Sequence, residues 1–186
     1  MRQSDTNDSA ARVGILPYAV SDGLDAIVSE AVDRLRARGV KVAGLLQRSG
    51  GAAPGGKRAM WVEDIGTGQM IRLDQPRGPG AIACTFDTGA LAQAAYLLQT
   101  AVESGAELLV VNRFGSVEAE GRGLRPEIAA AICSGLAVLI PVRASLLPEL
   151  QAFLGGSATC LPASVRPIEA WAEALLLRGR SPAVVA

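Results

Sequence analysis

The sequence predicts a doubly wound α/β fold, in which a mostly parallel sheet is covered by helices on both faces. Short apolar runs typical of buried strands alternate with longer segments whose apolar residues recur at helical spacing. Ala and Gly are abundant and aromatic residues make up only 4% of the chain, which suits helices packed closely on a sheet. With 186 residues, of which 49% are hydrophobic, the chain is long enough to bury the core of such a fold.

The first half of the chain is expected to supply two parallel strands, a helix and an antiparallel hairpin. The strands are apolar runs, the helix stops at Gly39, and a turn at Gly66-Thr67-Gly68 divides the hairpin. A Gly-rich segment before the hairpin is a loop by composition. In order, we expect strand Val13–Leu16, helix Leu24–Arg38, strand Val40–Leu46, loop Arg48–Lys57 and hairpin Ala59–Leu73.

The second half is expected to alternate helices and strands. Asp87 or Thr88 is the expected N-cap of its first helix, and Pro126 begins the next one. In order, we expect helix Thr88–Ser104, strand Leu108–Val111, a Gly-rich loop over Asn112–Arg125, helix Pro126–Ser134, strand Ala137–Val142, and helices Leu146–Phe153 and Ile168–Leu177. Flexible tails, 1–11 and 181–186, are expected to flank a single domain over 12–180.

Composition excludes several classes of function. The 18 basic and 18 acidic side chains balance, so nothing favours nucleic acid or an anionic membrane as a partner. The absence of histidine excludes imidazole bases and His-ligated metals, and the three cysteines form no CxxC motif. With no leader-like or membrane-spanning apolar run, the sequence predicts a cytoplasmic protein without membrane insertion and without a metal site.

In a doubly wound sheet, ligands bind beyond the carboxyl ends of the strands, so the first strand-helix connection is a candidate site. A phosphate-binding P-loop there would read G-x-x-x-x-G-K-[ST]. Tyr18 stands where the first glycine belongs, and Gly23 keeps the second. Leu24 replaces the phosphate-binding lysine and Asp25 replaces the magnesium-binding hydroxyl. The sequence thus predicts a P-loop-like fold with a degenerate P-loop.

A second difference from the P-loop NTPase pattern lies at the end of the Leu108–Val111 strand. P-loop NTPases place an Asp at such a strand end to order magnesium, whereas this chain has Asn112 followed by Arg113. A neutral amide binds a divalent cation far more weakly than a carboxylate does. Both nucleotide motifs are therefore altered together, which predicts negligible hydrolysis and makes Mg-nucleotide a disfavoured cofactor.

The densest polar cluster is the loop Asn112–Arg125, NRFGSVEAEGRGLR. Its arginines could clamp an oxyanion, because guanidinium groups bind such anions bidentately, and its glycines would let the backbone approach closely. The alternative is a solvated loop whose arginines pair internally with its glutamates. The candidate ligand-binding residues are Asn112, Arg113, Phe114, Gly115, Glu118, Glu120, Arg122 and Arg125, together with Cys84 and Asp87 from the loop CTFD. Cys84 reads either as a reactive thiol or as a small buried hydrophobe.

The runs VNRFGSVEAEGRGLRPEIAAAICSGLAVLIPV and CTFD resemble a small uncharacterised bacterial family, and the similarity spans most of Arg12–Ala163. Its members commonly lie beside molybdate-transport genes and are sometimes labelled molybdenum-transporter ATP-binding proteins. More distantly, Gly39–Gly44 and Gly56–Gly68 resemble thermophile-type P-loop nucleoside triphosphatases. The resemblance implies a P-loop-like fold and a link to molybdenum.

Three hypotheses follow. The first, which the sequence favours, is a non-hydrolytic protein that binds a small anion, with molybdate or another oxyanion near Arg113, Arg122 and Arg125. The second is an unorthodox nucleotide hydrolase or transferase that uses Glu118 or Asp87. The third is a ligand-free partner of a transport or cofactor-assembly complex. The sequence leaves the oligomeric state open.

Overall fold

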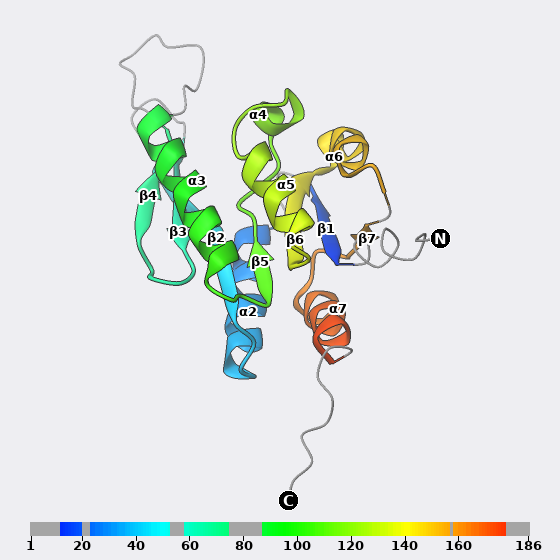
Figure 1. Cartoon of the computed structure of the whole chain (residues 1–186). Coiled ribbons are helices and arrows are strands. Elements are labelled where there is room, and N and C mark those ends of the chain that lie inside the picture. Colours follow the sequence, from blue (N-terminus) through cyan, green and yellow to red (C-terminus); the bar gives the residue numbers. More distant parts are fainter. Residues whose placement is uncertain (1–11, 20–22, 53–57, 75–86, 157, 178–186) are drawn as a thin grey trace, which may run out of the picture.

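Seven strands form one sheet in a computed structural model of the chain, which describes residues 12–19, 23–52, 58–74, 87–156 and 158–177. The order across the sheet is β4-β3-β2-β5-β6-β1-β7 (Figure 1). The neighbouring parallel strands are β2 (Val42–Ala52), β5 (Leu108–Val110), β6 (Ala137–Arg143), β1 (Val13–Tyr18) and β7 (Thr159–Cys160). The expected mostly parallel α/β sheet of P-loop-like type is confirmed.

Antiparallel strands extend the sheet on one side. β3 (Arg58–Asp64) and β4 (Met70–Arg72) form the expected hairpin. β3 also pairs antiparallel with β2, which continues to Ala52. The expected loop over Arg48–Lys57 is therefore wrong for residues 48–52. Composition marks these residues as loop-like, but β3 provides partners for their backbone groups.

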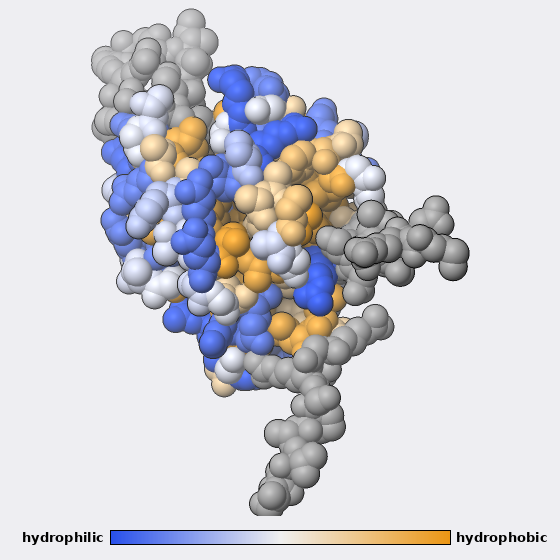
Figure 2. Space-filling model, in the orientation of Figure 1, coloured by the Kyte–Doolittle hydropathy of each residue, from blue (hydrophilic) through white to orange (hydrophobic). Residues whose placement is uncertain are grey.

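Helices cover both faces of this sheet. One layer, which we call the α2 face, contains α2 (Leu24–Ala37) and α7 (Val165–Leu177). The other, which we call the α3 face, contains α3 (Thr88–Glu103), α5 (Arg125–Cys133) and α6 (Leu147–Leu154). A short helix, α4 (Ser116–Ala119), stands above the sheet in Figure 1. The surface near α4 is hydrophilic, whereas the α5 and α6 region below it is more apolar (Figure 2).

Strand side chains alternate strictly between the two layers. In β6, Val138, Ile140 and Val142 belong to the core under the α3 face, while Ala137 and Leu139 belong to the core under the α2 face. This alternation follows from the two-residue repeat of a β-strand. It decides which helices each residue at the end of a strand can contact.

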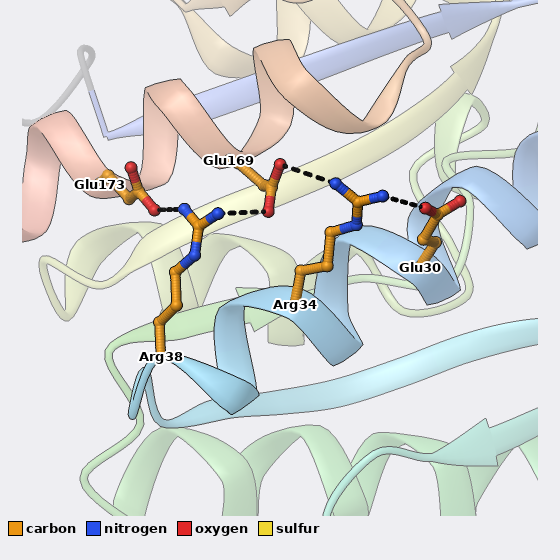
Figure 3. Close-up of polar contacts among 5 residues, drawn as sticks. All are labelled: Glu30, Arg34, Arg38, Glu169 and Glu173. Atoms are coloured by element: carbon orange, nitrogen blue, oxygen red, sulfur yellow. Dashed lines mark hydrogen bonds and ion pairs between the residues drawn. The ribbon is translucent and has the colours of Figure 1, made fainter.

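A row of charged side chains joins α7 to α2, as Figure 3 shows. The Glu169 carboxylate lies 3.4 Å from Nη2 of Arg38 and 3.8 Å from Nη1 of Arg34. Arg38 also pairs with Glu173, and Arg34 pairs with Glu30 at 2.6 Å. Acidic and basic groups alternate along the row, so each arginine is shared between two carboxylates.

The sequence did not predict two short elements, α4 and β7. α4 interrupts the expected Gly-rich loop, and β7 pairs with β1 over two residues, Gly14↔Thr159 and Ile15↔Cys160. Neither is long enough to produce a periodic pattern. Within the described part of the chain, no helix is both long and apolar enough to cross a membrane.

Candidate functional site

The candidate site lies at the carboxyl edge of the parallel strands, where β1, β5 and β6 end. Tyr18, at the end of β1, lies opposite Arg143, at the end of β6. Beyond β5, Phe114 bridges to Val142, and its N–H donates to the carbonyl of Pro141 at 2.9 Å. The β5–α4 connection therefore lies at the same edge as the start of α2, where sheets of this class bind ligands.

Arg113 links this connection to the first strand and helix. Its Nη1 donates to the Tyr18 hydroxyl at 3.2 Å, and its Nη2 donates to Oδ1 of Asp25. The guanidinium carbon lies 4.7 Å from the centre of the Tyr18 ring, within cation–π range. The Arg113 and Asp25 side chains are 23% and 21% exposed, so this ion pair is mostly shielded from solvent.

The residues that the sequence suggests as a degenerate P-loop have clear structural positions where the structure describes them. Gly23 is the N-cap of α2 with a φ of 57°, a left-handed conformation that suits glycine. Leu24 is only 3% exposed and belongs to the core under the α2 face. A lysine at this position would bring its charge into that core. Asp25, one residue later, faces the guanidinium of Arg113.

Asn112 is buried beside this ion pair, with 8% of its surface exposed. Its Oδ1 accepts no hydrogen bond from any residue in the described ranges. A cavity of about 10 Å³, room for one water molecule, is lined by Asn112, Arg113, Asp25, Leu24 and others. The carbonyl oxygen of Asn112 therefore has space for a donor that the described side chains do not supply.

Glu118 holds the β5–α5 connection together from inside. It is 8% exposed, and its two carboxylate oxygens accept hydrogen bonds from the backbone N–H groups of Gly115 at 3.0 Å and Leu124 at 3.1 Å. A carboxylate that binds two amides within its own loop is well placed to fix the shape of that loop. The predicted site residues Gly115 and Glu118 are thus brought together with each other.

The remaining predicted arginines lie apart from Arg113. Arg125 stacks 4.3 Å from the centre of the Phe153 ring and donates to the carbonyl of Glu118 at 3.0 Å. Phe153 also stacks with Phe114, whose side chain is 1% exposed, at 6.0 Å between ring centres. These contacts lie on the α3 face, whereas Arg113 lies on the α2 face. The structure does not bring Arg113 and Arg125 to a shared partner.

Arg122 and Glu120 form an exposed pair. Their side chains are 70% and 58% exposed, and Arg122 donates to Oε2 of Glu120. Pairs of this kind contribute little to stability because water competes for both charges. The structure brings these two residues to each other.

Asp87 is the N-cap of α3, as the sequence predicts. Its Oδ1 accepts from the N–H of Ala90 at 2.9 Å, and its own N–H donates to the carbonyl of Leu73 at 2.9 Å. These bonds place Asp87 beside the β3–β4 hairpin. Cys84 lies outside the described residues. Within the described ranges, no group of three or more His, Cys, Asp or Glu side chains could hold a metal ion.

Arg143 was not among the predicted site residues. We expected a strand over Ala137–Val142, but β6 continues one residue further and so brings Arg143 to the carboxyl edge beside Tyr18. A charged residue after an apolar run carries no strand signal of its own, so the sequence pattern ends before Arg143. Pairing with β1 along the whole length of β6 explains the extension.

Two comparisons with known proteins give a match. A family model described as Protein of unknown function (DUF2478) matches residues 13–171. The chain is also 36% identical over 160 residues to the Molybdenum import ATP-binding protein ModC 2 of Bradyrhizobium diazoefficiens. This similarity covers 86% of the chain but 18% of the relative, so the chain spans less than a fifth of that protein's length. No solved structure matches the chain.

Proposed function

Since the chain belongs to the family described as Protein of unknown function (DUF2478), we propose that it is a non-hydrolytic binding module linked to molybdenum import. Its ligand is a small oxyanion, with molybdate as the first candidate, and Arg113 is the residue that holds it. The similarity to a molybdenum import ATP-binding protein supports the link to transport.

The contact between Arg113, Tyr18 and Asp25 is the observation that carries this proposal. The guanidinium of Arg113 reaches the start of α2, near the place where a P-loop NTPase binds phosphate. Its planar group of N–H donors matches the geometry of an oxyanion. The Asp25 carboxylate already accepts from this fork, and it stands in for the charged oxygens of a ligand. An oxyanion would compete with Asp25 for Arg113, while the Tyr18 hydroxyl stays within reach as a second donor.

The residues around Arg113 support binding without nucleotide hydrolysis. Leu24 is in the core, and Asn112 presents a neutral amide where a magnesium-binding carboxylate is required. Asp25 pairs with Arg113 and stands where a P-loop has the hydroxyl that binds magnesium. Among the described residues around Arg113, the arrangement offers a cation for an anion but no lysine for a nucleotide's phosphates.

The hydrolase alternative has less support from the geometry. Both oxygens of Glu118 accept backbone hydrogen bonds within its own loop, and Asp87 caps α3 beside the hairpin. A general base needs free access to the proton that it removes. The hydrogen bonds of these two carboxylates within the described ranges lead away from Arg113, so we do not assign a catalytic base.

Isothermal titration with sodium molybdate, sulfate and phosphate tests the proposal on three proteins. Arg113→Gln should weaken binding about 10- to 150-fold, the worth of hydrogen bonds to a charged group. Asp25→Asn should tighten it, because the competing carboxylate is gone while the side chain keeps its size. We therefore expect Asp25→Asn to bind the anion most tightly, wild type less tightly and Arg113→Gln most weakly.

The contrary results are equally specific. Equal affinities for wild type and Arg113→Gln would remove Arg113 from the site. Undetectable heats for wild type and Asp25→Asn with all three anions would retire the oxyanion function. The module would then be a ligand-free partner of the transport or cofactor-assembly machinery, which is the remaining hypothesis.

A further inference from the structure

We propose that Arg143 provides the second guanidinium of the oxyanion site and that the site selects a doubly charged tetrahedral oxyanion. This inference rests on the proposed function and names a residue and a ligand class for it. Arg143 is the last residue of β6, and its Cα is the register partner of the Tyr18 Cα in β1. It thus lies next to the residue on which the Arg113 guanidinium stacks.

The alternation of β6 places Arg143 on the same side of the sheet as Arg113 and Asp25. Val142 belongs to the core under the α3 face, and Leu139 belongs to the core under the α2 face. Pro141 lines the cavity with Leu24, again on the α2 side. Because β6 pairs with β1 without interruption up to its end, Arg143 continues this alternation and emerges on the α2 face.

The Arg143 side chain is exposed and forms no hydrogen bond or ion pair with the residues that the structure describes. The other three arginines considered for the site all have side-chain partners. Arg113 pairs with Asp25, Arg122 pairs with Glu120, and Arg125 donates to the carbonyl of Glu118. Arg143 is therefore ready to accept a ligand without first leaving a protein partner.

The charges explain the ligand class. Within the described part of the site, Asp25 balances one of the two guanidinium groups, and the other remains uncompensated. An oxyanion that displaces Asp25 meets both arginines. Once Asp25 has turned to solvent, the four oxygens of a tetrahedral dianion such as molybdate or sulfate can accept from both forks at once, and its two negative charges attract the pair of guanidinium groups more strongly than the single charge of nitrate does. We expect molybdate and sulfate to bind more tightly than nitrate.

Titration of molybdate and nitrate into wild type, Arg143→Gln, Arg113→Gln and Lys41→Gln tests this assignment. Lys41 immediately precedes β2, at the amino ends of the parallel strands and so away from the proposed site. It is the control for the loss of one positive charge. Arg143→Gln should weaken molybdate binding about tenfold or more and reduce the preference over nitrate. Lys41→Gln should keep the wild-type affinity for molybdate and the wild-type preference for molybdate over nitrate. The melting temperature without added anion should be the same in Arg143→Gln and wild type, because no contact is lost.

The possible failures are distinguishable. If Arg113→Gln weakens molybdate binding while Arg143→Gln behaves like Lys41→Gln, Arg143 is not in the site and the proposed function stands. If wild type binds nitrate as tightly as molybdate, the dianion selectivity is wrong. If wild type binds neither anion, the proposed function fails and this inference fails with it.

Discussion

Glu118 is a charged residue that we assign a structural role in its loop rather than a catalytic one. Its carboxylate accepts from the N–H groups of Gly115 and Leu124, and the side chain is buried. We predict that Glu118→Ala lowers the free energy of unfolding by about 1–3 kcal/mol, because two amides lose their acceptor. Glu120→Ala, in the same loop but exposed, should change it by less than about 0.5 kcal/mol. Urea denaturation measures both, and equal losses would contradict the structural role of Glu118.

Asp74 gives the chain a pH-dependent contribution to stability. The Arg72 guanidinium, hydrogen-bonded to Asp74 at 3.0 Å and 3.2 Å, holds the pKa of the Asp74 carboxyl below its ordinary value. The folded state then takes up this proton less readily than the unfolded chain. The contribution is present above the ordinary carboxyl pKa of about 4 and is lost as the pH falls through the lowered pKa.

We predict from this that Asp74→Asn loses less stability than wild type on acidification. The measurement is urea denaturation of both proteins from neutral pH down to about pH 3, where the carboxyl approaches protonation. The two stabilities should converge as the pH falls. A constant difference between them over the whole range would show that Asp74 acts through its hydrogen bonds alone and not through its ionisation.

At the level of residues, the sequence identified candidate charged residues of the site but did not predict which of them form ion pairs with each other. The acidic and basic residues of Asn112–Arg125 were expected to form either a clamp or internal pairs. Arg122 and Glu120 do pair within the loop, but Arg113 pairs with Asp25, which is 88 residues away in the chain. Such a contact depends on the order of the strands, which no local pattern reveals.

The row of charges between α2 and α7 is a property of two elements acting together. Glu169, with a side chain only 7% exposed, is shared by Arg34 and Arg38 (Figure 3). We predict that Glu169→Gln lowers the free energy of unfolding by about 1–2 kcal/mol and reduces its dependence on salt. Glu30→Gln, at the exposed end of the row, is the control and should cost less than about 0.5 kcal/mol. Similar losses would show that burial does not strengthen the central pair.

The contact between β2 and β5 depends on one glycine. Gly44 has a φ of 112°, and a Cβ there would lie 2.1 Å from the carbonyl oxygen of Val110. We predict that Gly44→Ala costs roughly 3 kcal/mol or more, because the strands must separate and the backbone is strained. Gly68→Ala has a comparable φ of 74° and no atom within 4 Å, so it should cost only about 1–2 kcal/mol. Thermal denaturation compares them, and equal costs would rule out the close approach.

Periodic elements were predictable from the sequence, and those stabilised by distant partners were not. The strand expected over Val13–Leu16 and the helix expected over Leu24–Arg38 appear within two residues of their predicted limits. The continuation of β2 to Ala52 was missed because β3 provides its hydrogen bonds. The two-residue strand β7 was missed for a similar reason, since β1 alone defines it.

At the scale of the whole molecule, the P-loop-like sheet leads us to a prediction about nucleotides. We predict negligible turnover of ATP and GTP, because Leu24, Asp25 and Asn112 stand where lysine, a hydroxyl and aspartate are required. Release of inorganic phosphate, measured with magnesium present, checks this. Turnover that persists through purification and disappears in Asn112→Ala would overturn the prediction, because that change would tie the activity to this chain.

Arg113 and Phe114 are consecutive residues whose side chains lie on opposite faces of the sheet. Arg113 contacts Tyr18 and Asp25, and Phe114 stacks on Phe153 of α6. The two side chains share one peptide, so a change in the backbone at Arg113 is felt at Phe114. We predict that an anion that draws Arg113 away from Asp25 alters the packing of Phe114 against Phe153. A fluorinated phenylalanine at position 153 would report that change as a shift of its NMR signal.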